Sequence, residues 1–214
     1  MSDHYEIMIP MAKDQAHLPP EGYHTLYLNH LDMGLRFPVP RFIQNLCDHL
    51  KVSPSQLTPN SYSSLLALGV ILWFFRAPFS LHLIYNFTQV RQQDVGKFFI
   101  LLKPELGCIK ENPTSHKGWM NLYFFLRLNA REGVSWHCDM SWSKKPTKRD
   151  PPLPAQEYDP TKFLNDMSGK CFNAQELIQE DLLCHFGFSR KGVEVEGDLD
   201  IAFSFLLTTR SVSF

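Results

Sequence analysis

Cysteine and histidine stand close together at three places in the sequence, and these residue types are suited to metal binding or to nucleophilic catalysis. The three places are Cys47-x-His49, His137–Cys138 and Cys184–His185. Structural zinc sites usually combine two ligand pairs spaced as C-x2–4-C or H-x3–5-H, and none of these three pairs has that spacing. We interpret them as core thiols beside surface imidazoles. The sequence therefore predicts no metal ligands.

Catalysis by a cysteine–histidine pair also needs a third group that orients the histidine. Cys138 with another histidine is one such possible pair, but the sequence marks no orienting group for it. The prolines and hydroxyl residues between 38 and 59 are better explained as helix starts, because no general base is spaced to serve them. We expect no catalytic residue and no cofactor, and hence no enzyme.

A basic cluster offers chemistry of a different kind, the binding of phosphate groups. The segment KKPTKR contains Lys144, Lys145, Lys148 and Arg149. Such a cluster is typical of a nuclear-localisation signal or of a nucleic-acid contact. Arg127, Arg131 and nearby aromatic residues could take part in the nucleic-acid contact. The alternative is a solvated linker, and the prolines on either side favour it.

Composition limits what the whole chain can be. The 214 residues are 44% hydrophobic and 20% charged, with a formal net charge of −1. This balance suits one ordinary domain with tails, and it argues against a nucleic-acid surface that covers the whole chain. Five cysteines without a C-x-x-C pair, and a first segment without signal-peptide features, predict reduced thiols and an intracellular location, in the nucleus or the cytoplasm.

The longest apolar run is Leu65–Phe75, which has eleven residues. A membrane-spanning helix needs about 20. We expect this run to be a core helix, with Leu68, Leu72 and Phe75 buried, and we expect no contact with a membrane.

The spacing of apolar residues and the positions of helix-capping residues predict the helices and strands. Apolar residues at helical spacing indicate helices over about 20–34, 40–51, 59–75 and 81–90, with hydroxyl caps at Ser53, Thr58 and Ser80 and a capping box completed by Gln56. Aromatic-rich runs indicate strands over 97–102 and 120–128, which could pair as a hairpin, and a short third strand over 134–142. Two short helices are expected over about 161–169 and 173–188.

These elements predict an α+β fold, in which an N-terminal helical half packs on a small antiparallel sheet. A flexible tail is expected over 1–18, the α+β domain over 19–142 and a Pro-rich basic linker over 143–160. A short helical appendage and tail follow over 161–214, with truncation of the chain as an open alternative.

Four motifs resemble the plant gypsy-type transposon domain. They are GLRFP (Gly34–Pro38), P-x-Q-L-x-P-N (Pro54–Asn60), S-x-K-G-W (Ser115–Trp119) and the pair Trp136…Trp142. Together they lie within residues 18–142. The resemblance implies a retrotransposon-derived plant protein without an established reaction.

The acidic residues give no support to a transposase activity. A transposase of the two-metal type needs acidic residues that converge on its metal ions. Asp32, Asp48, Asp150 and Asp159 fall in a turn, on a polar helix face and in the linker, at spacings that imply no convergence. The HKG stretch before Trp119 likewise lacks the frame of a phosphate-binding loop, and we expect a turn that enters a strand there.

Two functions remain open on the sequence. The first is a non-catalytic interaction module that binds a protein partner or itself. The alternative is a nucleic-acid-binding component of a gypsy-type mobile element, with Lys144, Lys145, Lys148 and Arg149 as the contact residues. The sequence does not identify the partner.

Overall fold

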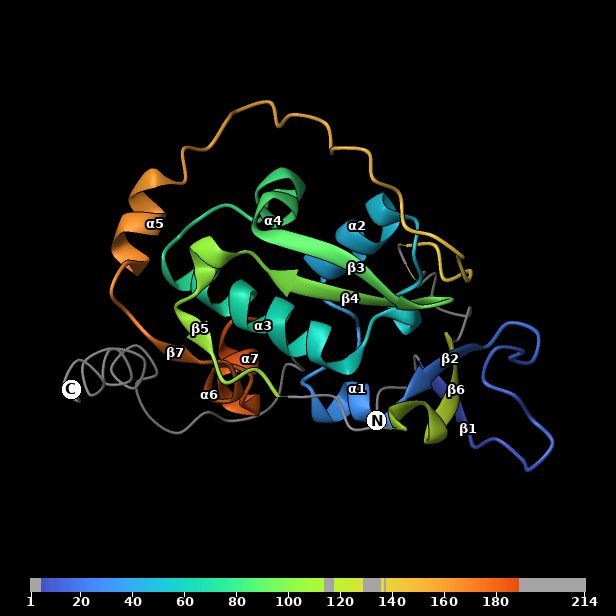
Figure 1. Ribbon diagram of the computed structural model, residues 1–214. Coiled ribbons are helices and arrows are strands. Elements are labelled where there is room, and N and C mark those ends of the chain that lie inside the picture. Colours follow the sequence, from blue (N-terminus) through green and yellow to red (C-terminus); the bar gives the residue numbers. More distant parts are fainter. Residues whose placement is uncertain (1–4, 114–117, 129–135, 137, 189–214) are drawn as a thin grey trace.

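The computed structural model describes residues 5–113, 118–128, 136 and 138–188, and it has the predicted α+β fold (Figure 1). In chain order the elements are β1 (Tyr5–Met8), β2 (His24–Tyr27), α1 (Leu28–Asp32), α2 (Arg41–Leu50), η1 (Pro54–Gln56), α3 (Pro59–Phe74), α4 (Leu81–Phe87), β3 (Thr88–Asp94), β4 (Lys97–Leu102), η2 (Pro104–Leu106), β5 (Ile109–Lys110), η3 (Trp119–Asn121), β6 (Tyr123–Leu128), α5 (Thr161–Met167), β7 (Phe172–Asn173), α6 (Ala174–Leu177) and α7 (Glu180–His185).

Helix α3 is the centre of the molecule. It lies between the β3–β4 hairpin on one side and α6 and α7 on the other (Figure 1). Every residue from Ser61 to Leu72 is buried. A helix that is apolar all round can be stable only where neighbours cover all its faces. The unbroken apolar run in the sequence is therefore explained by the central position of α3.

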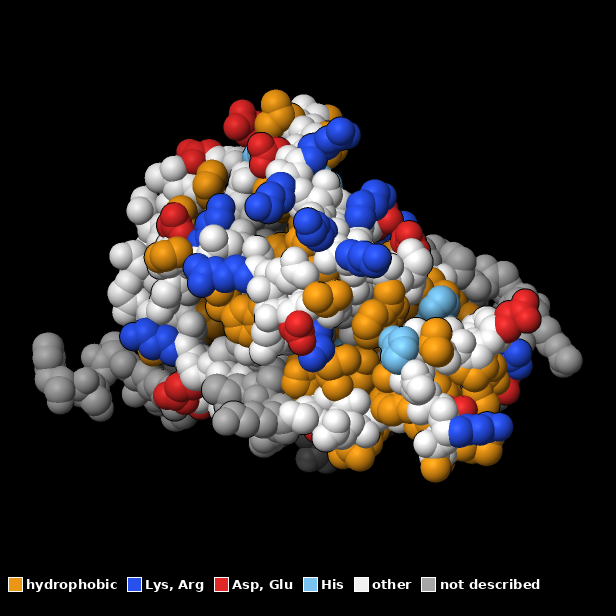
Figure 2. All heavy atoms as spheres, turned by 45° about the vertical axis from the view of Figure 1, so that its right-hand side comes forward, with side chains coloured by type: hydrophobic (Ala, Val, Ile, Leu, Met, Phe, Trp, Pro, Cys, Tyr) orange, Lys and Arg blue, Asp and Glu red, His pale blue; other side chains and the backbone are white. Residues whose placement is uncertain are grey.

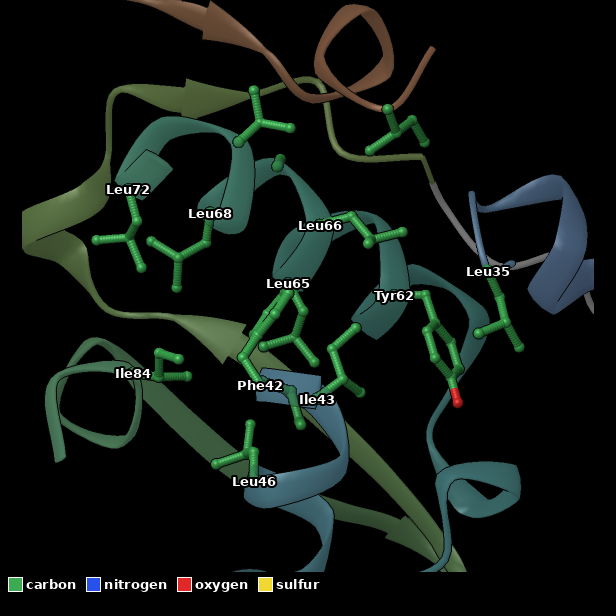
Figure 3. Packing of buried hydrophobic residues seen from close by; sticks show 14 of the residues in the cluster. Leu35, Phe42, Ile43, Leu46, Tyr62, Leu65, Leu66, Leu68, Leu72 and Ile84 are labelled. Carbon is green, nitrogen blue, oxygen red and sulfur yellow. The ribbon is translucent and has the colours of Figure 1, made fainter. Parts of the chain in front are cut away.

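The core forms where α2 meets α3. Figure 3 shows Phe42, Ile43 and Leu46 of α2 pointing toward Leu65 of α3, and all four side chains are buried. Two of the predicted core positions, Leu68 and Leu72, are 0% exposed. Phe75, the third, lies at the end of α3 and is only half-buried, with its ring against Phe163.

The predicted helix starts are largely confirmed. Ser53 and Gln56 form a reciprocal capping box around η1, and the Ser80 hydroxyl accepts a hydrogen bond from the Leu83 amide at the start of α4. Thr58 is the exception, because its side chain makes no capping bond to the backbone. Its hydroxyl bonds instead to Asn60 Oδ1 and Ser61 Oγ, each at 2.8 Å.

Strand pairing differs from the prediction. The described residues form a three-stranded antiparallel sheet in the order β1–β6–β2, the antiparallel β3–β4 hairpin, and the short parallel pair β5–β7. The expected hairpin between 97–102 and 120–128 is therefore wrong. Residues 97–102 pair with the preceding strand through a tight turn at Gly96 (φ +72°). A short turn costs less loop entropy than a long loop, so the local partner is preferred.

Two segments expected to be helical contain strands. Residues 20–34 form β2 and only then the five-residue helix α1, because β2 pairs with β6. The helix expected over 81–90 ends at Phe87, where Thr88 begins β3. Both strand segments are too short for the spacing of their apolar residues to distinguish a strand from a helix.

Near both ends of the described chain, the structure also differs in part from the prediction. Residues 5–8, expected within a flexible tail, form β1 and pair with β6. Helix α5 lies where a helix was expected, but the second expected helix is divided into β7, α6 and α7. Trp136 and residues 138–142 form no strand, and the remainder of the predicted third strand and residues 189–214 lie outside the described residues.

Candidate interaction surfaces

The predicted nucleic-acid contacts lie on a segment that is held against the body of the protein. We call Ser143–Arg149 the basic strap. The Thr147 amide donates to the Leu50 carbonyl at 2.7 Å, and the Arg149 carbonyl lies 2.8 Å from His49 Nε2, both at the end of α2. Gln92 Nε2 of β3 donates to the Lys144 carbonyl at 3.3 Å. The first part of the expected linker is therefore docked, while the rest arches over to α5 (Figure 1).

One buried amide anchors the start of the strap. Gln56 Nε2 donates to the carbonyls of Ser143 (2.7 Å) and Gly96 (3.0 Å), and Gln56 Oε1 accepts from the Ser143 amide (2.9 Å). The same oxygen accepts from the Ser53 amide at 3.1 Å, which is the capping-box bond. The capping spacing revealed Gln56 in the sequence, but nothing there indicated its bonds to Gly96 and Ser143.

The anchoring leaves the basic side chains exposed. Lys144, Lys145, Lys148 and Arg149 are all exposed, and the hydrogen bonds that hold the strap use its backbone. On the face that Figure 2 presents, Lys and Arg side chains gather in the upper half, with most acidic side chains toward the edges of the group. The structure thus brings the four predicted residues together on one fixed segment.

An open hollow of about 310 Å3 lies between α2 and the strap. Its lining consists of Asp48, His49, Lys51, Leu81, Thr147 and Arg149. Lys51 adds a cation that no sequence motif indicated, and its Nζ is 3.6 Å from Asp48 Oδ1. The Asp48 carboxylate reduces the positive charge of the hollow. Lys144, Lys145 and Lys148 are exposed and do not line it, so they form the better anion-binding group.

Arg127 has a different environment. It lies on β6, where its guanidinium pairs with Glu6 of β1 and its Cζ is 4.8 Å from the centre of the Tyr23 ring. The hydrogen bond from Tyr23, and then the bond from Arg127, lower the pKa of the Glu6 carboxyl. Arg127 thus joins β1 to β6, and this contact competes with the predicted phosphate contact. Arg131 lies outside the described residues.

Six exposed apolar side chains lie on β1, on the loop after it, at the first residue of α1 and at the residue before β6. We call this set the apolar surface; its members and exposed fractions are Ile7 (44%), Ile9 (82%), Met11 (62%), Leu18 (65%), Leu28 (43%) and Leu122 (64%). The loop after β1 is held on the sheet, because the Tyr123 hydroxyl donates to the Asp14 carbonyl at 2.8 Å. The Leu28 amide donates to the Leu122 carbonyl at 3.0 Å, which places these two residues together.

The two tryptophans of the Trp136…Trp142 pair lie in different places. The Trp136 ring packs against His24 (5.3 Å between centroids) and Tyr5 (6.4 Å), beside the apolar surface. Trp142 directly precedes the strap, and a Cβ added to Gly96 would come within 3.5 Å of its ring. Its side chain remains partly exposed, at 37%.

The Gly118–Trp119 end of the S-x-K-G-W motif is a turn that enters β6, as expected. Gly118 has a φ of +84°, and Trp119 opens η3. The Trp119 ring packs against the rings of Tyr27 (4.8 Å) and His30 (5.4 Å). Residues 115–117 of the motif lie outside the described residues.

The cysteine–histidine pairs lie in separate environments. Cys47 is buried in the core, whereas neighbouring His49 binds the strap. Burial raises the pKa of Cys138 to about 11, which keeps it a thiol at neutral pH. Cys184 lies 3.8 Å from Glu180 Oε1, and His137 is outside the described residues. In the part of the chain that the structure describes, no three His, Cys, Asp or Glu side chains are grouped so that they could hold a metal ion.

Over the same described ranges, no helix combines the length and the apolar character that crossing a bilayer requires. The long apolar helix α3 is enclosed by protein instead. Comparison with known proteins found no matching family model, no similar curated protein and no similar solved structure.

Proposed function

We propose that this chain is a non-catalytic interaction module of a retrotransposon-derived plant protein, and that it associates with a protein partner or a second copy of itself through the apolar surface. The family part of the proposal rests on the four sequence motifs. The interaction part rests on the distribution of exposed side chains. No step of the proposal needs a cofactor.

The number of exposed apolar residues in and around the three-stranded sheet carries the proposal. Large exposed apolar patches on globular proteins mark interaction sites more often than single scattered residues do. Among the described residues, six of the ten exposed large hydrophobic side chains belong to the apolar surface, and the other four are Trp73, Val95, Trp142 and Leu153. Figure 2 also shows hydrophobic side chains gathered in the lower half of its face, below the Lys and Arg group.

Sedimentation velocity over a range of concentrations tests self-association. The variant Ile9→Asp/Leu122→Asp places charges on the apolar surface at side chains that are 82% and 64% exposed, so its stability should change little. The matched control is Val95→Asp/Leu153→Asp, at side chains that are 74% and 76% exposed elsewhere. We expect the wild type and the control to dimerise and the first variant to stay monomeric. Equal behaviour of all three proteins would contradict self-association through this surface.

A second candidate function, the binding of single-stranded nucleic acid, is favoured by the basic strap. Such binding combines cations that contact the phosphate backbone with aromatic rings on which bases stack, and the strap offers four exposed cations beside the exposed Trp142 ring. Trp142 could stack on a base while Lys144 and Lys145 contact phosphates. This surface is distinct from the apolar surface, so the two functions can be tested separately.

The dependence of binding on salt concentration distinguishes the two candidate functions. Phosphate contacts make affinity fall steeply with salt concentration, with a logarithmic slope of about −0.7 per contact for single strands. Burial of apolar surface is not weakened by added salt. For a fluorescent oligonucleotide we expect no measurable binding at ~150 mM salt. Salt-sensitive submicromolar binding that is lost in Lys144→Ala/Lys145→Ala/Lys148→Ala/Arg149→Ala would favour the second candidate.

A further inference from the structure

Two of the five free cysteines lie at corresponding positions, each immediately before one of two neighbouring strands. Ile109 of β5 pairs in parallel register with Phe172 of β7, and Cys108 and Cys171 each stand one residue earlier. The backbone connection continues at this position, because the Phe172 amide donates to the Cys108 carbonyl at 2.7 Å. The two cysteines thus occupy the next register position of the same ladder.

This placement fits the Cα separation that a disulfide needs. Neighbouring strands lie about 4.7–4.9 Å apart, and a disulfide needs a Cα separation of about 4.4–6.8 Å. Side chains alternate along a strand, and Phe172 points into the core, where it is 4% exposed. Cys108 and Cys171 should therefore share one side of the two strands, where Cys108 still packs against the edge of the core. Both are only half-buried, so a small oxidant can reach them.

The local electrostatics agree with close thiols. Burial raises the pKa of the Cys108 thiol, two backbone hydrogen bonds oppose this effect, and the nearby Cys171 raises the pKa again. A second cysteine pair is also within electrostatic range, because Cys138 contributes to the raised pKa of Cys47. Cys47, however, is 0% exposed, which shields that pair from oxidants.

We propose that Cys108 and Cys171 form a reversible disulfide when the protein meets a peroxide, which makes the β5–β7 pair a redox-controlled staple. Because burial disfavours the Cys108 thiolate, the Cys171 thiolate attacks a peroxide oxygen, and the O–O bond breaks to give a sulfenic acid and, after protonation, water. The other thiolate attacks the sulfenic sulfur, the S–S bond forms, and the hydroxyl leaves as a second water. Two thiols are oxidised and one hydrogen peroxide is reduced, so the reaction balances. A thiol reductant reverses it.

The staple would act on a weakly secured part of the fold. The β5–β7 ladder has only two residue pairs. It nevertheless connects the C-terminal segment that follows α5 to β5, which lies beside the core. Between Cys108 and Cys171 the chain contains β6, the basic strap and α5. A cross-link closes this long loop in the unfolded state as well, so it should raise the unfolding temperature. This inference does not depend on the proposed function.

The test treats the fully reduced protein with about one equivalent of hydrogen peroxide and maps its peptides by mass spectrometry without reduction. We expect an intramolecular peptide pair that joins Cys108 to Cys171, two hydrogens lighter than the reduced pair. The unfolding temperature should rise by roughly 5–15 °C. Dithiothreitol should restore both the separate peptides and the original temperature.

Cysteine variants identify the residues that cause the cross-link and the rise in unfolding temperature. Cys108→Ser and Cys171→Ser should each abolish the cross-link and the temperature shift, whereas Cys184→Ser, at another half-buried cysteine, should retain both. The wild-type peptide map decides the question even if a variant is unstable. A link between Cys47 and Cys138, links only between molecules, or sulfinic acid at Cys108 and Cys171 without a bond between them would overturn the proposal.

Discussion

The Nε2 atom of His30 lies 2.9 Å from the carbonyl oxygen of Leu57, and this contact joins α1 to the segment that precedes α3. Because a carbonyl only accepts, the ring proton is on Nε2, which leaves Nδ1 unprotonated. Nδ1 is buried and has no hydrogen-bond partner among the described residues. The imidazole is 0% exposed and is surrounded by the rings of Tyr27, Tyr62 and Trp119.

This environment predicts loss of stability in acid. Burial lowers the pKa of His30 to about 3 in the folded protein, from a normal value of 6.5. Between these values the unfolded chain binds a proton that the folded chain does not. The free energy of unfolding should therefore fall as the pH decreases from about 6.5 toward 3, by up to about 1.4 kcal/mol per pH unit.

Urea unfolding at pH 7, 6 and 5 measures this effect. The difference between the wild type and His30→Gln isolates it, because other titrating groups contribute equally to both proteins. We expect the wild type to lose stability faster than the variant as the pH falls. Parallel pH dependences would show that His30 is not neutral in the folded state.

The Leu72 side chain should contribute far more stability than the Thr58 hydroxyl. Leu72→Ala leaves a cavity at a position that is 0% exposed, and should cost about 2–5 kcal/mol. Thr58→Ala removes hydroxyl contacts to Asn60 and Ser61 and should cost about 1 kcal/mol. Leu122→Ala, at a 64% exposed side chain, is the control and should stay within about 0.5 kcal/mol of the wild type. Denaturant midpoints check this order, and a reversed order would refute the core position of Leu72.

Loss of Gln56 should release the strap. Gln56→Ala removes hydrogen bonds to Ser53, Gly96 and Ser143 and leaves buried backbone groups unpaired. We expect a loss of about 2–4 kcal/mol in stability and faster cleavage by trypsin after Lys144 and Lys148.

Limited proteolysis under native conditions, followed by mass spectrometry, measures that cleavage. Gln92→Ala is the control, because it removes a peripheral 3.3 Å contact to the strap. It should change the cleavage rate less than Gln56→Ala does. Equal rates in the wild type and Gln56→Ala would show that the strap is held by other contacts.

The four basic side chains of the strap should contribute little to stability. Lys144, Lys145, Lys148 and Arg149 are exposed, and the contacts of the strap to α2 and β3 use backbone atoms. Replacing all four by Ala should change the unfolding midpoint by no more than the effect of ordinary surface substitutions. Thermal unfolding at ~150 mM salt checks this, and a large decrease would mean that these side chains pack against the body.

The sequence by itself determined the features that depend on near neighbours in the chain. The capping box of Ser53 and Gln56, the cap at Ser80 and the burial of Leu68 and Leu72 all follow from short-range spacing or from composition, and the structure confirms them. The α+β class follows in the same way, because each segment's periodicity is a local property.

Tertiary structure alone decided which strands pair, where the strap docks and which surfaces remain uncovered. The 3.6-residue and 2-residue periods cannot be distinguished in segments as short as His24–Tyr27, so pairing with β6 made that segment a strand. Gln56 and Ser143 are 87 residues apart in the chain, and no local pattern connects them. Contacts between distant residues depend on the balance of loop entropy and packing over the whole chain, and that balance is not a property of any one segment.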